Sequence, residues 1–239
     1  MNLQIRIRKR LPHFDLSLDI ACPAEMMTVV IGPSGAGKTT LMRIIAGLDK
    51  PEEGFIRFGD EVWLDTRRRV FLPPQKRRLG YVFQDYPLFP HLDIYENAAF
   101  AAGADKKVVG SLLARFGIGH LGDRKPEAVS GGERQRCALC QALARAPRLL
   151  LLDEPFSALD VFTRRDLRDQ LHQMKAELSV PIVYVTHDVN EALYLADELL
   201  PIVDGRVDRQ WMQRSIERAD AARPDRARAV REPRLSLAY

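Results

Sequence analysis

The segment GPSGAGKT, residues 32–39, has the glycine spacing and the final Lys-Thr pair of a loop that binds phosphate. It lies between an apolar run, MMTVVIG, and a helix-forming segment, KTTLMRIIAGL, which is the context that such a loop requires. A tight strand-to-helix turn would explain the glycines but not Lys38 and Thr39 together. The predicted phosphate-binding residues are Gly32, Pro33, Ser34, Gly35, Ala36, Gly37, Lys38, Thr39 and Thr40.

The chemistry of this loop follows from its groups. Its backbone N–H groups can surround phosphate oxygens, and the positive end of the following helix attracts them. Lys38 would reach the β- and γ-phosphates of a nucleotide, and the hydroxyl of Thr39 would ligate Mg²⁺.

Two adjacent acids follow the apolar run LLLL. Asp153 would end a buried strand, where its carboxylate can help to hold hydrated Mg²⁺, and Glu154 would then polarise an attacking water. Such a pair can also begin an ordinary loop, but the phosphate loop upstream favours the catalytic interpretation.

Two further side chains are expected near the phosphates. His187 follows the apolar run PIVYVT, and a parallel sheet directs the ends of its strands toward one edge. A lone histidine at a strand end is usually structural, but here its imidazole can reach the γ-phosphate. Gln84 ends the segment GYVFQ, where a neutral amide can contact both the metal and the water.

The segment AVSGGERQRCALC, residues 128–140, opens a predicted helix with Ser-Gly-Gly. Ser130 and Glu133 fit a capping box, which needs no ligand. Gly131 and Gly132 remain unexplained by it, since each costs about 1 kcal/mol relative to alanine inside a helix. Glycine permits close approach to the backbone, and a helix N-terminus attracts anions, so we expect a phosphate contact here.

The elements that position these groups alternate between strands and helices, which predicts an α/β fold with a mainly parallel sheet. Alternating residues in 3–7 and 14–20 predict two half-buried strands at the start of the chain. Residues 94–116 form a helical, alanine-rich stretch, another helix covers 162–178, and LLPIVDGRV predicts a final hairpin.

Composition limits the class of protein. The chain has 239 residues, of which 46% are hydrophobic and 28% charged, as in an ordinary globular protein. No apolar run approaches the roughly 18 residues of a membrane span, and the first residues lack a signal-peptide core. Cys137 and Cys140 form a CxxC without the second pair that a zinc site needs, so we expect them to pack on one helix face.

The net charge of +4 resides mostly in residues 211–239, which hold seven arginines and four acids. The remaining chain is close to neutral, so no nucleic acid partner is expected. Residues after about 210 shift to Arg, Ala and Pro, which predicts a loosely held basic tail.

Together these motifs resemble the ATP-binding-cassette (ABC) ATPases over roughly residues 1–210. GPSGAGKT resembles the Walker A motif, LLLLDEP Walker B, and SGGER the family signature, with Glu133 where glutamine is common. Gln84 resembles the Q-loop glutamine, Asp160 in SALD the D-loop aspartate, and His187 the switch histidine. The resemblance implies a P-loop NTPase of the ABC type, with antiparallel strands at the N-terminus, a mainly parallel central sheet and a helical subdomain inserted at about residues 85–146.

The resemblance also implies cofactors and partners. Two subunits would pair head to tail as a homodimer around ATP and Mg²⁺, and the signature, Ser130 to Glu133, would close over the nucleotide of the partner. The dimer would serve integral-membrane permease subunits, and through them a solute-binding protein, at the cytoplasmic face of the inner membrane.

Among importer ATPases, RRLGYVFQDYPLFPHLDIYEN and FLPPQKRR are similar to the molybdate type. In the other motifs, the chain is nearly as similar to the ATPase subunits of sulfate, iron and polyamine importers. No C-terminal regulatory domain is expected. Phe14 is the nearest candidate for an adenine contact, although its alternation with Leu16 favours a core position. The rival classes are a soluble ABC protein acting on DNA or ribosomes, and a nucleotide-binding module without turnover.

Overall fold

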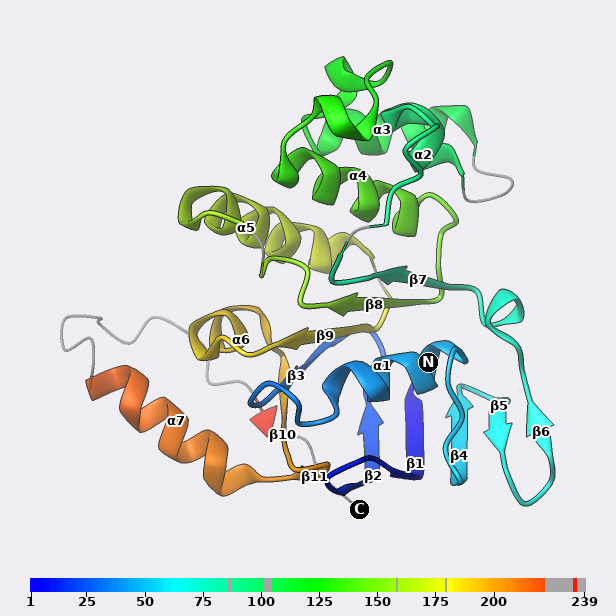
Figure 1. The fold of residues 1–239 in the computed structure, drawn as a ribbon, viewed down its shortest axis with the longest axis vertical. Coiled ribbons are helices and arrows are strands. Elements are labelled where there is room, and N and C mark those ends of the chain that lie inside the picture. The colour runs from blue at the N-terminus through cyan, green and yellow to red at the C-terminus, as the bar shows by residue number, and fades with distance from the viewer. Residues whose placement is uncertain (86, 101–104, 158, 179, 222–233, 236–239) are drawn as a thin grey trace. The chain divides into compact units, whose positions relative to one another are not determined.

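The computed structural model of the chain describes residues 1–85, 87–100, 105–157, 159–178, 180–221 and 234–235 (Figure 1). They form two compact units. The first contains Met1–Arg77 and Met174–Tyr239, and the second contains Arg78–Gln173. Each unit is described in turn.

An antiparallel sheet opens the first unit. Its strand order is β2 (Asp15–Cys22), β1 (Leu3–Arg10), β4 (Glu53–Phe58), β5 (Glu61–Asp65) and β6 (Val70–Phe71). Exposure alternates along β1 and β2, as expected for strands with one face on the core. Both predicted N-terminal strands are therefore present, whereas the sequence analysis did not predict the short strands β5 and β6.

Parallel strands form the second layer of this unit. β3 (Met27–Ile31) lies between β9 (Ile182–Thr186) and β10 (Glu198–Val203), and all three are parallel. Every residue of β3 and β9 is buried, which explains why their sequences are continuous apolar runs rather than alternating ones. At the edge, β11 (Arg206–Val207) completes the predicted hairpin with β10, and β12 (Arg234–Leu235) pairs with β10 in parallel.

Three α-helices belong wholly to this unit: α1 (Lys38–Ala46), α6 (Val189–Leu195) and α7 (Arg209–Ala221). The last of them corrects the first part of the predicted loose tail, because a helix covers residues 209–221; residues 222–233 and 236–239 of that prediction lie outside the described part of the chain. Met212 is fully buried, and α7 contacts both α6 and β10. A few apolar residues thus hold the helix in place, although the average composition of the segment is polar.

A buried guanidinium stabilises the end of α1. Arg77 is only 1% exposed, and its Nη1 donates to the carbonyls of Ile44 and Ile45 in the last turn of the helix. Its Nε donates to the carbonyl of Leu72, and its Cζ lies 5.4 Å from the ring centroid of Trp63. Burial lowers the pKa of Arg77 to about 10, so the group remains a cation at neutral pH.

The second unit has a parallel strand pair, β7 (Leu79–Val82) and β8 (Leu149–Asp153). The helix α5 (Val161–Leu178) follows β8, close to the predicted range, and its residues up to Gln173 belong to this unit. The interpretation of the chain as α/β with N-terminal antiparallel strands and mainly parallel strands thereafter is confirmed.

Three helices follow β7 in the chain and precede β8 (Figure 1). They are α2 (Ile94–Ala99), α3 (Lys106–Arg115) and α4 (Gly131–Leu143), and each contacts the other two. The single helical stretch predicted over 94–116 is corrected to two helices, since α2 ends at Ala99 and α3 begins anew with Asp105 as its N-cap. Residues 101–104 lie outside the described part of the chain.

Two short 3₁₀ turns, Gly119–Leu121 and Pro126–Ala128, precede α4, and another, Pro74–Lys76, precedes Arg77 in the first unit. Within the described residues, no helix combines the length and the apolar character needed to cross a membrane.

Candidate functional site

The loop between β3 and α1 has the backbone of a phosphate-binding turn. Gly35 and Gly37 adopt positive φ angles of 79° and 96°, which glycine accepts without the strain that a Cβ would cause. Gly37 is the N-cap of α1, so the N–H groups of the first helical turn begin directly after it. The positive end of α1 therefore faces this loop.

Gly32 is required for a different reason. A Cβ atom at Gly32 would lie 1.9 Å from the carbonyl oxygen of Ile202 in β10, far inside any contact distance. The first glycine of the motif thus allows the loop to pack on its own sheet, and the other two allow its turn.

The ammonium group of Lys38 lies across the loop. It donates to the carbonyls of Gly32 and Pro33, both at 2.9 Å, and the residue is only 4% exposed. By contrast, Ser34, Gly35 and Thr39 are exposed, so the outer side of the turn is accessible to a ligand.

His187 leaves the sheet beside this loop. Ile31, the last residue of β3, pairs with Thr186, the last residue of β9, so Gly32 and His187 leave the same edge of adjacent parallel strands. His187 is exposed. The parallel direction of the strands had predicted that His187 and the phosphate loop lie at the same edge of the sheet.

Hydrogen bonds on either side fix the turn that carries His187. The side chain of Asp188 accepts from the backbone N–H groups of Asn190 and Glu191 and caps α6. The hydroxyl of Thr186 donates to Oε2 of Glu191 at 2.5 Å and accepts from the N–H of Asp188 at 3.0 Å. These capping residues were not singled out from the sequence, although Asp188 directly before a helix is a usable signal.

In the second unit, Gln84 and the paired acids also leave a common edge. Val82 of β7 pairs with Leu152 of β8, so the two chain segments leave this parallel strand pair at the same end. Gln84 is exposed, whereas Asp153 is only 2% exposed. Oδ2 of Asp153 accepts a hydrogen bond of 3.2 Å from the hydroxyl of Tyr81.

Glu154 has a strained backbone. Its φ of 46° lies in the left-handed region, where a non-glycine residue costs on the order of 1–3 kcal/mol. Ser157 holds this turn, because its N–H and its hydroxyl both donate to the carbonyl of Glu154, at 3.2 and 3.0 Å. Such strain is typical of a functional position, and the pattern of residue types did not predict it.

The start of α4 forms the predicted capping box. The N–H of Ser130 donates to Oε2 of Glu133 at 2.7 Å, and the N–H of Glu133 donates to Oγ of Ser130 at 3.3 Å. Two hydrogen bonds to the Glu133 carboxylate hold its pKa below the usual value. The bond from the backbone N–H of Ser130 has the larger effect, and the bond from the Ser130 side chain has the next largest.

The two signature glycines have different surroundings. A Cβ at Gly131 would meet only Nη2 of Arg134, at 3.9 Å, whereas a Cβ at Gly132 would lie 2.7 Å from Cγ2 of Thr163. Thr163 belongs to the first turn of α5, which Asp160 caps by accepting from the N–H groups of Phe162 and Thr163 at 3.0 Å. Gly132 therefore has a steric role within its own chain, which the sequence analysis did not foresee.

Phe14 is not part of the core. It is half-buried beside β2, whereas Leu16 is fully buried, so the core position that alternation favoured is wrong. A Cβ on Gly37 would lie 3.6 Å from Cε2 of Phe14, which places the ring next to the phosphate loop. Its contact with adenine remains a prediction.

The cysteines lie in apolar surroundings. Cys137 and Cys140 are both buried in α4, and burial raises the pKa of Cys137 to about 12 and that of Cys140 further. Across the described residues, no group of three or more His, Cys, Asp or Glu side chains is arranged to hold a metal ion.

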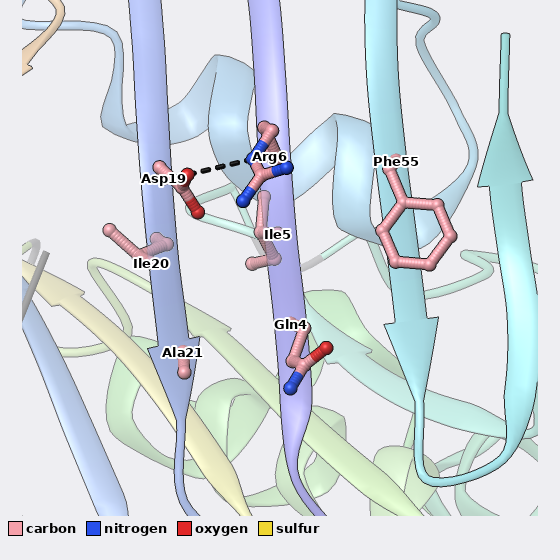
Figure 2. Close-up of a pocket in the computed structure, with 7 residues that line it drawn as sticks. All are labelled: Gln4, Ile5, Arg6, Asp19, Ile20, Ala21 and Phe55. Atoms are coloured by element: carbon pink, nitrogen blue, oxygen red, sulfur yellow. Dashed lines mark hydrogen bonds and ion pairs between the residues drawn. The ribbon is translucent and has the colours of Figure 1, made fainter. Parts of the chain in front are cut away.

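A surface pocket lies elsewhere, on the antiparallel sheet (Figure 2). β1, β2 and β4 line it, and an ion pair of 2.7 Å between Arg6 and Asp19 crosses from β1 to β2. None of the predicted site residues is among its lining residues.

The predicted site residues thus fall into two groups. Residues 32–40 and His187 gather at one sheet edge of the first unit. Gln84, Asp153 and Glu154 gather at a strand edge of the second unit, which also holds the signature and Asp160. Mg²⁺ prefers oxygen ligands and takes few of them from protein besides those of phosphate and water. The hydroxyl of Thr39 in the first unit, and the amide of Gln84 and the carboxylate of Asp153 in the second, each offer an oxygen of this kind.

A buried parallel strand, a glycine-rich turn and a helix that begins with Lys-Thr define the class of P-loop nucleotide-binding proteins. Within that class, the sequence assigns the chain to one family. The sequence profile of the ABC transporter family matches residues 15–157, and the chain belongs to that family.

Relatives of known name agree with this. The chain is 42% identical over 210 residues to the molybdenum import ATP-binding protein ModC of Pseudomonas aeruginosa, covering 86% of this chain and 58% of the relative. It is 44% identical over 212 residues to the molybdate/tungstate import ATP-binding protein WtpC of Archaeoglobus fulgidus, covering 87% and 85%. The chain spans about three fifths of the length of the first of these relatives.

Solved structures show the same fold. A dimeric ATP-binding cassette in a post-hydrolysis state with ADP and Pi superposes with a TM-score of 0.73 at 29% identity, covering 87% of this chain and 97% of that one. The cbiO1 protein of Clostridium perfringens, part of an ABC transporter complex, superposes with a TM-score of 0.77 at 25% identity, covering 92% and 94%.

Proposed function

We propose that the protein is the ATP-hydrolysing subunit of an ABC importer. The observation that carries this proposal is the phosphate loop, in which Lys38 spans the turn while the N-terminal end of α1 and the outer backbone remain accessible. Membership of the ABC transporter family supports it.

The reaction divides among the residues as follows. Gly35, Gly37 and the first turn of α1 bind the phosphates, and Lys38 neutralises the charge on the β- and γ-phosphates. Thr39, Gln84 and Asp153 would hold Mg²⁺, which would supply positive charge to stabilise the charge that develops on the phosphates.

Glu154 accepts a proton from the attacking water in this proposal. Its strained backbone, held by Ser157, orients the carboxylate. His187, on the turn fixed by Thr186 and Asp188, contacts the γ-phosphate.

The complete hydrolytic site requires a second copy of the chain. Ser130, Gly131 and Glu133 present the N-terminus of α4 to the nucleotide of the partner subunit, and Asp160 lies beside them. The head-to-tail homodimer acts on integral-membrane permease subunits from the cytoplasmic face of the inner membrane, and a solute-binding protein delivers the cargo.

For the cargo we propose molybdate or tungstate. The relatives ModC, a molybdenum import ATP-binding protein, and WtpC, a molybdate/tungstate import ATP-binding protein, are 42% and 44% identical to this chain and support this assignment. Sulfate, iron or polyamine would be the cargo if the similarity reflects the ATPase alone.

Phosphate release from Mg-ATP by the purified protein tests the activity. Lys38→Ala should abolish turnover, because the loop loses its only lysine. Lys50→Ala is the matched control, since Lys50 is exposed and lies over Phe71. Equal turnover in Lys38→Ala and in the wild type would refute the proposed ATPase site.

Uptake in cells tests the cargo separately. Deletion of the gene, in cells lacking a second importer for these anions, should reduce accumulation of molybdate and tungstate at low external concentration. Reduced uptake of sulfate, iron or polyamine instead would keep the ATPase and reassign its cargo.

A further inference from the structure

Tyr81 is an unexpected neighbour of the proposed metal-binding carboxylate. Its side chain is half-buried on β7, and its hydroxyl donates to Oδ2 of Asp153 at 3.2 Å. The register explains the contact. Tyr81 pairs with Leu151 of β8, and Asp153 lies two residues further along the same face.

The ring of Tyr81 is itself held in place. It stacks on the ring of Phe83, with 4.0 Å between the centroids and 21° between the planes. Phe83 immediately precedes Gln84 in the chain. The hydroxyl is therefore presented by a ring with little freedom to rotate away, and that ring is next to the segment that leads to Gln84.

A carboxylate at a metal site needs such a partner. Asp153 is only 2% exposed, so solvent cannot orient it freely. A hydrogen bond to one carboxylate oxygen fixes the rotation of the group and directs its other lone pairs, and outer hydrogen-bond partners of metal ligands typically contribute tenfold to a hundredfold in affinity.

We propose that Tyr81 is a positioning residue of the Mg²⁺ site: its hydroxyl holds the Asp153 carboxylate in the orientation that receives the hydrated metal. The inference rests on the proposed function, since it takes Asp153 as a contact of the metal. Tyr81 contacts neither nucleotide nor water in this proposal and acts only through Asp153.

Tyr81→Phe tests it, because this change removes the hydroxyl and keeps the stacked ring. Mn²⁺ serves as the probe, and its binding to the full-length protein in the presence of ADP is measured by electron paramagnetic resonance. We expect the Mn²⁺ affinity to fall by roughly tenfold. ADP affinity measured in EDTA should remain unchanged, which a general loss of structure would not allow.

Two controls make the result specific. Tyr95→Phe removes the hydroxyl of another half-buried tyrosine in the same unit and should leave Mn²⁺ affinity unchanged. In an Asp153→Asn background, Tyr81→Phe should have no further effect on Mn²⁺ affinity, because its only route to the metal is gone.

The outcomes separate the two claims. If Asp153→Asn weakens Mn²⁺ binding while Tyr81→Phe leaves it unchanged, the positioning role is refuted and the metal site stands. If Asp153→Asn has no effect on Mn²⁺ binding, the placement of the metal in the proposed function is refuted, and the role of Tyr81 with it.

Discussion

Gly132 and Thr163 are in such close contact that no side chain fits between them, since a Cβ atom on Gly132 would lie 2.7 Å from Cγ2 of Thr163. A substitution at Gly132 would therefore disturb the packing of α4 on α5 whatever its effect on nucleotide. Gly131, whose Cβ would meet only the end of Arg134, is the better position to test for a phosphate contact.

We expect Gly131→Asp to abolish hydrolysis while the protein still folds and binds ATP. An acid in the first turn of a helix interacts favourably with the helix dipole, so the variant should fold. Its negative charge would, however, repel the γ-phosphate of the nucleotide bound by the partner subunit. Mixing this variant with Lys38→Ala should recover part of the hydrolysis, because one composite site then has an intact loop and an intact signature. No recovery from heterodimers isolated with two affinity tags would argue that each signature serves its own chain.

Glu154→Gln should slow hydrolysis by about a hundredfold or more, the loss expected when a general base is removed. ATP binding should persist, since Lys38 and the phosphate loop are untouched. Single-turnover hydrolysis and sizing of the ATP-loaded variant measure the two effects, and a stable dimer is expected with ATP. Turnover close to that of the wild type would transfer the role of base to another residue.

Gly32→Ala should destabilise the fold, because its methyl group would overlap the carbonyl of Ile202. Overpacking of this kind costs about 1–3 kcal/mol or more in the free energy of unfolding. Gly110→Ala is the control: it lies inside α3, and a Cβ there would have no atom within 4 Å other than those of its chain neighbours and its own helix backbone. Alanine there should stabilise by roughly 0.5–1 kcal/mol. Urea unfolding of both variants measures the contrast, and equal stabilities would contradict the packing role of Gly32.

Glu133→Gln should change how stability depends on pH. Hydrogen bonds from Ser130 depress the pKa of Glu133, so its stabilising effect is present above the pKa of the unfolded state and is lost as pH falls through the lower, folded value. Glutamine preserves the capping geometry but does not titrate. The advantage of the wild type in melting temperature should therefore be present at neutral pH and disappear as pH falls through the lowered pKa of Glu133 in the folded state. An advantage independent of pH would exclude the carboxylate as its source.

Much of this fold follows from periodicity and local chemistry. β3, β8 and β9 are continuous apolar runs because they are buried on both faces, and the capping box at Ser130 is written in its spacing. The turns that carry the predicted site residues could be located because each motif places particular residue types directly after a strand.

Other features depend on contacts between distant segments. The need for glycine at position 132 depends on Thr163, which belongs to another helix. The helix α7 was missed because one buried residue, Met212, outweighs a polar composition. No local pattern encodes these relationships.

The buried guanidinium of Arg77 gives α1 an unequal pair of ends. In the proposed function, the N-terminus of α1 binds and releases nucleotide, whereas carbonyls of its last turn accept hydrogen bonds from Arg77, a cation that is only 1% exposed. These hydrogen bonds oppose displacement of α1 along its axis. Lysine could not replace this anchor, since a single ammonium cannot spread its donors over carbonyls as far apart as those of Leu72 and Ile45. In the proposed function, the position of the nucleotide-binding loop would therefore depend in part on the opposite end of α1, where Arg77 binds.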